Sequence, residues 1–222
     1  MDTDRKLMQI IEETSERYKE TLTRLAMGED ASGKDTEMKE NIGGCEMKIL
    51  VVVDMQNDFI DMALGTKEAV AIVPNVVKKI ADNSWDKIYV TYDTHGENYM
   101  ETSEGKNLPV PHCIKGSKGW ELNAEVEAAL QAVDCPVVKV EKPTFGSVRL
   151  AELVGEDLAK EECGVELVGL CTDICVVSNA LLLKANYPEM PIALDASCVA
   201  AVTPESDEAA LTTMKMCQIQ VL

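Results

Sequence analysis

Apolar positions along this chain recur in two patterns, as short continuous runs and as longer stretches with helical spacing. Runs typical of buried strands lie at residues 48–54, 87–91, 137–140, 165–170, 191–194 and 218–222. Stretches typical of amphipathic helices lie at residues 66–82, 121–133, 147–160, 174–186 and 204–217. The alternation predicts an α/β fold, a three-layer sandwich with a mainly parallel, roughly six-stranded, Rossmann-like sheet and helices on both faces.

The first 46 residues differ in composition from the rest. Apolar residues recur there with helical spacing, at Leu7, Ile11, Tyr18, Leu22 and Leu25. This stripe predicts an amphipathic helix that pairs with a second subunit or, as we favour, docks on the main domain. Residues 27–45 contain few apolar positions and several glycines, which is typical of a linker. We therefore expect two parts, residues 1–46 and a main domain at residues 47–222.

Composition narrows the classes of function. The net charge of −18 argues against nucleic acid or an anionic membrane as partner, because such partners need clustered Lys and Arg. We find neither an apolar run long enough for a membrane span nor a secretory leader, and we expect a cytoplasmic protein. A chain of 222 residues does not need disulfides for stability, so we interpret the eight cysteines as reduced thiols.

Three reactive side chains stand where predicted strands end. Asp54 and Lys142 close two apolar runs, and Cys175 lies just inside the helix that follows a break at Gly169. The carboxyl ends of parallel strands meet at the sheet edge where ligands bind, so we expect the three to lie together. A cysteine nucleophile needs a base and a cation that favours the thiolate, and Asp54 and Lys142 supply them. The N–H groups of the helix N-terminus also favour an anion.

Structural interpretations of the same residues stay open. Cys175 could be one more buried small residue, Asp54 could cap a loop, and Lys142 could be solvated. In another class of function, Cys171 and Cys175 form a thiol pair for redox chemistry or a soft metal, which leaves Asp54 and Lys142 without a role. A third alternative is an interaction protein that uses its N-terminal helix on an inactive scaffold.

A second group of candidate residues lies in the long polar connection between residues 95 and 120. It contains the only two histidines, His95 and His112, and begins directly after Asp93. Two imidazoles with one or two carboxylates suit Zn²⁺, Mn²⁺ or Fe²⁺ better than Mg²⁺ or Ca²⁺, so we predict a divalent metal, with Zn²⁺ preferred. The alternative is that both are ordinary loop residues. A dinucleotide cofactor has little support, because no glycine fingerprint follows a strand.

Three segments carry a family resemblance: LVVVDMQNDF, EKPTFGS and GLCTDICVVSNA, in this order. They resemble the signatures of the isochorismatase-like cysteine hydrolases, the superfamily that includes nicotinamidase, and the resemblance covers about residues 47–222. It implies a catalytic triad of Asp54, Lys142 and Cys175. It also implies a cis peptide at Leu170–Cys171 and an oxyanion hole formed by the N–H groups of Cys171 and Cys175. Residues 47–222 are thus expected to be a hydrolase domain.

The metal group also matches this resemblance. Nicotinamidases bind a metal through an Asp-x-His pair and a later histidine, sometimes with a carboxylate between them. Asp93, His95 and His112 match this order, and Glu104 is our choice for the carboxylate, with Glu97 and Glu101 as competitors.

The resemblance implies cleavage of a small amide to an acid and ammonia through a thioester, with nicotinamide to nicotinate as the leading case. A related reaction on a carbamoyl or ureido compound is the alternative. The sequence departs from the nicotinamidase pattern before His112, where residues 108–111 contain no tryptophan. We therefore predict that Phe59, Tyr99 and Trp120 form the aromatic wall of the substrate pocket. The expected partners are the small-molecule substrate and further copies of the chain in a homo-oligomer.

Overall fold

The computed structural model describes residues 16, 19–21, 23–24, 42–82 and 84–222. The chain divides into two units, Met1–Lys39 and Glu40–Leu222. In the first unit, the described residues are helical. The apolar positions of the predicted stripe, Leu7, Ile11, Tyr18, Leu22 and Leu25, lie outside the described residues, as do residues 27–41 of the predicted linker. The division of the chain into residues 1–46 and 47–222 therefore stays a prediction.

Within the described residues of the second unit, six strands form one parallel sheet in the order β3-β2-β1-β4-β5-β6. The strands are β1 (Met47–Val53), β2 (Lys87–Asp93), β3 (Val137–Lys142), β4 (Cys163–Leu170), β5 (Ile192–Ala200) and β6 (Gln220–Val221). The chain first adds strands on one side of β1 and then on the other, which places a topological switch point between β1 and β4.

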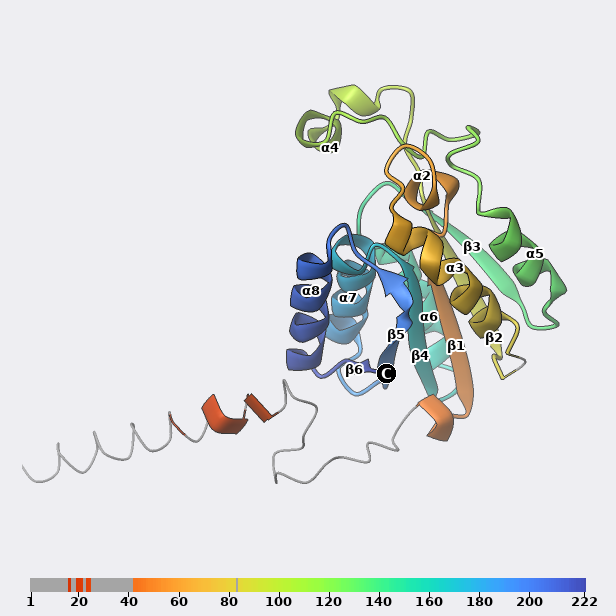
Figure 1. The fold of residues 1–222 in the computed structure, drawn as a ribbon. Helices are drawn as coiled ribbons and strands as arrows, with labels where there is room; N and C mark the ends of the chain where they lie inside the picture. Colours follow the sequence, from red (N-terminus) through yellow and green to blue (C-terminus); the bar gives the residue numbers. More distant parts are fainter. Residues whose placement is uncertain (1–15, 17–18, 22, 25–41, 83) are drawn as a thin grey trace, which may run out of the picture. The chain divides into compact units, whose positions relative to one another are not determined.

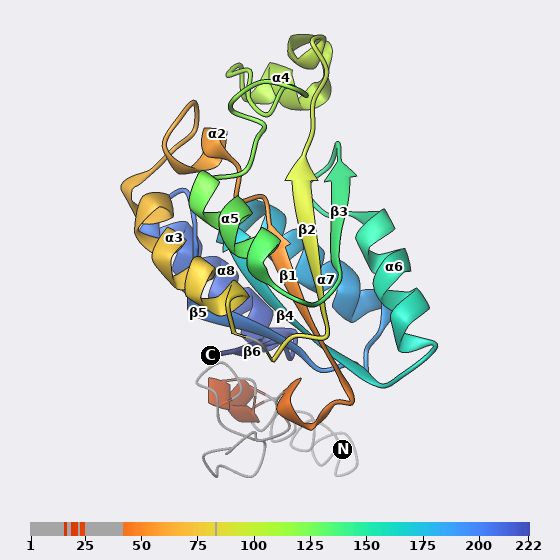
Figure 2. The ribbon, with the colours of Figure 1, turned by 90° about the vertical axis from the view of Figure 1, so that its right-hand side faces the viewer.

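Helices cover both faces of the sheet, and this confirms the predicted three-layer fold (Figures 1 and 2). They are α2 (Asn57–Ile60), α3 (Lys67–Ile80), α4 (Ser103–Asn107), α5 (Ala124–Ala132), α6 (Val148–Leu158), α7 (Val177–Asn186) and α8 (Pro204–Met216). Alternate residues of β1 enter different cores: Leu50 and Val52 pack with α3 and α5, whereas Val51 packs with α6, α7 and α8. This two-sided burial explains the nearly all-apolar strand sequences.

Two regions differ from the sequence prediction. The long connection after β2 is not structureless, because it contains a 3₁₀ turn at Tyr99–Glu101 and the short helix α4. Strand β5 continues six residues beyond the predicted end at Leu194, because the polar residues Asp195 and Ser197 interrupt the apolar pattern without ending the strand. This stretch is tolerated because Asp195 forms an ion pair of 2.7 Å with Lys79 and accepts a hydrogen bond from Ser197.

Gly169 shapes the end of β4. Its φ is +114°, and a Cβ atom there would lie 2.1 Å from the carbonyl oxygen of Val53 on β1. Only glycine fits a position that combines this backbone conformation with so close an approach. The switch point is therefore narrow at Gly169, directly before the turn that carries Cys175. In the part of the chain that the structure describes, no helix is long and apolar enough to cross a membrane.

Candidate active site

Asp54 directly follows β1 at the switch point. It is fully buried and has a φ of +46°. The hydroxyl of Thr91 on β2 donates a hydrogen bond of 2.6 Å to Oδ1, and the Asp54 N–H donates to the same hydroxyl at 3.2 Å. Burial raises the pKa of Asp54, and the positive charge of Lys142 opposes this rise. A carboxyl with a raised pKa exchanges protons more readily near neutral pH.

Lys142 ends β3, two strands away from Asp54. Its Cα lies in register with Asp93 on β2, and the long side chain reaches Asp54, where Nζ lies 2.7 Å from Oδ2. The side chain is only 1% exposed. Burial lowers the pKa of Lys142, but the charges of Asp54, Cys175 and Asp93 outweigh this effect and raise the pKa. Lys142 is therefore a fixed cation within the site.

Cys175 lies in a π-helical turn at Thr172–Val176, directly before α7. This turn begins two residues beyond the end of β4, and the peptide bond between Leu170 and Cys171 is cis. The ammonium of Lys142 donates to Sγ of Cys175 at 3.4 Å, and the thiol also contacts Asp54. Burial raises the pKa of the thiol well above its usual value, the charge of Asp54 raises it further, and Lys142 lowers it. The fold thus brings the three predicted residues together.

Asn179 joins two parts of this arrangement, and sequence reasoning missed it. Its amide group donates to the carbonyl of Cys175 at 2.8 Å and to the carbonyl of Phe145 at 3.2 Å. Its Oδ1 accepts a hydrogen bond of 2.9 Å from the N–H of Ser147. Asn179 thereby fixes the turn after Lys142 against the helix that carries the thiol. The signal in the sequence was a polar residue within a largely apolar stretch, one helical turn after Cys175.

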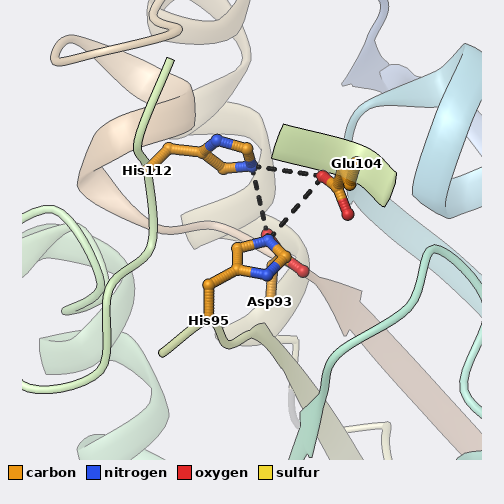
Figure 3. A group of neighbouring side chains, drawn as sticks. All are labelled: Asp93, His95, Glu104 and His112. Atoms are coloured by element: carbon orange, nitrogen blue, oxygen red, sulfur yellow. Dashed lines mark ion pairs between the residues drawn. The ribbon is translucent and has the colours of Figure 1, made fainter. Parts of the chain in front are cut away.

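Asp93, His95, Glu104 and His112 form a second cluster, in which one ligand atom from each residue lies within 4.8 Å of the others (Figure 3). Asp93 ends β2 and Glu104 lies on α4. The two histidines lie before and after α4 in the sequence. Nε2 of His112 lies 3.4 Å from Asp93 Oδ2 and 3.6 Å from Glu104 Oε1. Of the three glutamates considered from the sequence, Glu104 is thus the one beside both histidines, whereas Glu97 and Glu101 are exposed.

The donor atoms of this cluster fit a divalent cation. Nδ1 of His112 lies 2.9 Å from the carbonyl oxygen of Val110, which accepts but does not donate, so in the neutral imidazole Nε2 carries the lone pair and faces the carboxylates. Nε2 of His95 is buried, makes no hydrogen bond and lies 2.8 Å from Asp93 Oδ2. Burial raises the pKa of Asp93, but its contacts with His112, His95 and Lys142 lower it below its usual value. Two nitrogens and two carboxylates match the ligand preference of Zn²⁺.

The three residues that follow Met55 hold this second cluster in place. The Gln56 amide donates to the carbonyls of Asp93 and Trp120, both at 2.9 Å, and its Oε1 accepts from the Asp93 N–H at 2.8 Å. Asn57 donates to the carbonyl of Lys118, and the carboxylate of Asp58 accepts from the N–H of Cys113. The three residues belong to the segment LVVVDMQNDF, and sequence reasoning assigned them no role.

One cavity of about 980 Å³ connects the two clusters, because Cys175, Asp93, His95, Glu104 and His112 all line it. The predicted aromatic wall is partly wrong. Phe59 lines the cavity, but Tyr99 is 1% exposed and does not, since its ring packs against both histidines and its hydroxyl donates to the carbonyl of Leu108. Trp120 lines a different cavity, packs against Tyr92 and donates from Nε1 to Thr94.

The cavity therefore has Phe145 and Phe59 as its aromatic lining residues besides the histidines. Phe145 lies in the EKPTFGS segment and was not predicted. The eight cysteines, all within the described residues, are free thiols. Cys171 also lines the cavity, and burial raises the pKa of its thiol to about 12.

Comparisons with known proteins agree with this fold. The Isochorismatase domain model matches residues 48–222. A pyrazinamidase/nicotinamidase from Streptococcus mutans UA159 is similar in structure, with a TM-score of 0.69, 27% identity, and coverage of 79% of this chain and 99% of that one. A pyrazinamidase of Pyrococcus horikoshii, solved in complex with zinc, has a TM-score of 0.61 and 26% identity, with coverage of 79% of this chain and 98% of that one.

Among curated proteins, an uncharacterized isochorismatase family protein PncA of Bacillus subtilis (strain 168) is 28% identical over 142 residues, which are 60% of this chain and 76% of that protein. The chain belongs to the isochorismatase family.

Proposed function

We propose that this chain is a metal-assisted cysteine amidohydrolase that cleaves a small carboxamide to a carboxylic acid and ammonia, with nicotinamide as the leading substrate. The observation that carries the proposal is the position of the Lys142 ammonium, 2.7 Å from Asp54 and 3.4 Å from the Cys175 sulfur. One cation thus balances both the acid that accepts the proton and the thiolate that forms. The zinc-bound pyrazinamidase and the nicotinamidase among the structural neighbours support the choice of substrate.

Asp54 starts the reaction by taking the proton of the Cys175 thiol, whose pKa is too high for spontaneous ionisation at neutral pH. The thiolate attacks the amide carbonyl carbon, and the N–H groups of Cys171 and Cys175 stabilise the oxygen that becomes negative. Asp54 returns the proton to the leaving nitrogen, ammonia departs, and an acyl thioester remains on Cys175. Asp54 then activates a water that hydrolyses the thioester and releases the acid.

Asp93, His95, Glu104 and His112 would hold the divalent metal, for which Zn²⁺ is our first choice and Mn²⁺ or Fe²⁺ the alternatives. When bound, this metal acts as a Lewis acid that anchors or polarises a ring nitrogen or oxygen of the substrate. The four side chains line the cavity that also contains the nucleophile, so one small ligand spans both groups. We also infer that the protein works in the cytoplasm as a homo-oligomer, for which the sequence gives the only support.

The test is ammonia release from nicotinamide by the purified full chain supplied with Zn²⁺, Mn²⁺ or Fe²⁺. The Cys175→Ala variant is expected to release none, and Cys217→Ala, which removes an exposed thiol, is the matched control and should retain full activity. Mass spectrometry of rapidly quenched enzyme should show an acyl group on Cys175 alone. If nicotinamide is inert but a carbamoyl or ureido compound releases ammonia in a Cys175-dependent way, the mechanism holds and the substrate is the alternative one.

A further inference from the structure

The cavity is larger than a single-ring carboxamide requires. Its volume of about 980 Å³ lies at the top of the range of roughly 300–1,000 Å³ that is typical of sites for drug-sized ligands. The reacting groups, Cys175 and the four metal-binding residues, account for only five of its twenty lining residues. Most of the wall therefore has no role in the reaction proposed above.

Much of this remaining wall is apolar and comes from separate segments of the chain. Phe59 lies on α2, Phe145 follows β3, Ile174 lies in the π-helical turn, Val202 follows β5, and Leu108 follows α4. Three of these side chains are unusually exposed for their type, with exposed fractions of 47% for Phe145, 53% for Val202 and 38% for Leu108. Because all three line the same cavity, a ligand that fills it would cover apolar surface that is otherwise exposed.

The backbone holds these three rim residues in fixed positions. The carbonyl of Phe145 accepts a hydrogen bond from Asn179, and the carbonyl of Leu108 accepts one from the hydroxyl of Tyr99. The N–H of Val202 donates to the carboxylate of Asp173 at 3.3 Å. The exposed apolar side chains are therefore presented by an anchored backbone, and a ligand that packs on them does not have to order the chain.

The charge of the cavity selects against an anionic ligand. Its lining residues, all within the described part of the chain, include no lysine or arginine, and the two carboxylates among them belong to Asp93 and Glu104. A divalent cation on these carboxylates would balance their two charges and leave no surplus positive charge. The buried ammonium of Lys142, 3.4 Å from the Cys175 sulfur, is already paired with Asp54. A substrate that carries a free carboxylate would thus enter without a partner.

From these observations we infer that the preferred substrate is a neutral aryl or heteroaryl carboxamide that carries an apolar substituent, which packs on Phe145, Val202 and Leu108 while the amide meets Cys175. The inference rests on the proposed amidohydrolase activity and narrows its substrate class. Under this inference, unsubstituted nicotinamide and carbamoyl compounds that carry a carboxylate are poorer substrates than the substituted carboxamide.

A series of pyridine-3-carboxamides tests the inference with the zinc-loaded full chain. The ring carbon that is meta to both the carboxamide and the ring nitrogen carries hydrogen, methyl, phenyl or carboxylate, and ammonia release gives kcat/KM for each compound. The phenyl compound is expected to exceed nicotinamide by about tenfold, chiefly through a lower KM, because it buries apolar area that nicotinamide leaves exposed. The carboxylate compound is expected to fall at least about tenfold below nicotinamide.

Substitutions at two positions locate the effect. Phe145→Ala should reduce the ratio of kcat/KM for the phenyl compound to that for nicotinamide by about fivefold. Val148→Ala, which removes another exposed apolar side chain only three residues along but outside the cavity, is the matched control and should leave the ratio unchanged. Phe145→Lys should reverse the preference by improving the carboxylate compound relative to the phenyl compound.

Cleavage of nicotinamide with no preference for the phenyl compound, or with a preference for the carboxylate compound, would overturn the substrate class and leave the proposed function intact. A preference that Phe145→Ala does not reduce would also overturn it. Ammonia release from none of these compounds would instead contradict the proposed function. The two failures are therefore distinguishable.

Discussion

The two clusters of reactive side chains in this protein are built in different ways. Asp54, Lys142 and Cys175 come from the ends of three strands, and parallel pairing of the sheet brings residues together that are distant in sequence. Asp93 and His95 stand at one strand end, but their partners Glu104 and His112 are brought back by a loop that Gln56, Asn57 and Asp58 hold through hydrogen bonds. The geometry of the first cluster depends on strand pairing, and that of the second depends on a loop held by hydrogen bonds.

The clusters also differ in charge. In the first, the ammonium of Lys142 contacts both Asp54 and the thiol, so charge is balanced within the chain itself. In the second, two carboxylates face two imidazoles, and Nε2 of His95 is buried without a hydrogen bond. A bound divalent cation, as proposed above, would complete that arrangement. The comparison predicts that changes in the first cluster abolish chemistry, whereas changes in the second mainly alter metal and substrate binding.

The largest effect is expected from neutralising either charged member of the first cluster. Asp54→Asn and Lys142→Met should each reduce ammonia release by about 10⁴-fold or more, the size of effect measured in established catalytic triads. Their effects on the Cys175 thiol should be opposite. Burial raises its pKa most, Asp54 raises it further and Lys142 lowers it. Asp54→Asn should therefore lower the pKa and Lys142→Met should raise it, as measured by the pH dependence of alkylation with iodoacetamide.

Peptide mass spectrometry assigns the alkylated sulfur, and Cys175→Ala gives the background from the other seven thiols. Each single variant leaves one buried charge without its partner and should lose about 3–5 kcal/mol of unfolding free energy, whereas the double variant Asp54→Asn/Lys142→Met should be more stable than either. Shifts of the thiol pKa in the same direction in both single variants would contradict the assigned charge balance.

The second prediction concerns His112. His112→Ala should reduce the affinity for Zn²⁺ by at least about 100-fold, because it removes one of four candidate ligands. The measurement is a competition titration with a chromophoric chelator, together with the metal content of the purified protein. Asn98→Ala is the matched control, since Asn98 lines the same cavity but lies outside the cluster. Equal zinc affinity in His112→Ala and the unaltered chain would sink the metal assignment.

A smaller effect is expected from Glu104. Glu104→Gln should weaken zinc binding by roughly tenfold, because an amide oxygen is a poorer ligand than a carboxylate for this cation. Glu97→Gln and Glu101→Gln make the same chemical change at exposed positions of the same connection and should leave zinc affinity unchanged. A loss at either of these positions, with none at Glu104, would show that another carboxylate completes the site.

The smallest effect on turnover is expected from breaking a buried ion pair at the first residue of β2, the end of the strand away from Asp93. Asp157 is 3% exposed, pairs with Lys87 at 2.7 Å and accepts a hydrogen bond from Tyr89. Asp157→Asn should leave kcat/KM for nicotinamide unchanged and reduce the free energy of unfolding at pH 7 by about 1–3 kcal/mol. This variant separates a buried ion pair that supports only the fold from the one between Asp54 and Lys142.

The effect of Asp157 should also depend on pH. Burial raises its pKa, but the contacts with Lys87, Tyr89 and Lys160 lower it below the ordinary aspartate value. A group with a depressed folded-state pKa stabilises the fold above its unfolded pKa of about 4 and loses this contribution as the pH falls. The stability difference between the unaltered chain and Asp157→Asn should therefore shrink between pH 5 and pH 3 in urea titrations. A difference that grows toward low pH would contradict this sign.

Some interactions could be found only in the folded structure. Thr91 is an ordinary strand residue in sequence, yet its hydroxyl orients Asp54. Asn179 is one polar residue in an apolar helix, yet it connects Cys175 with the turn after Lys142. Tyr99 and Trp120 were assigned to the substrate wall from their type and position, and packing instead placed one behind the histidines and the other in a separate cavity. Side-chain direction in an irregular loop is not encoded by any periodic pattern.

The sequence by itself determined the parallel sheet, its two covered faces and the strand ends that carry Asp54, Lys142 and Cys175. It could do so because strand and helix periods are local, and parallel pairing places consecutive carboxyl ends at one edge. Only the tertiary structure decided which glutamate joins the histidines and which apolar side chains form the cavity rim. The choice of glutamate depends on how the connection after β2 folds against Gln56, Asn57 and Asp58. The rim joins that connection to Phe145 after β3 and Val202 after β5, so both choices depend on contacts between residues that are distant in sequence.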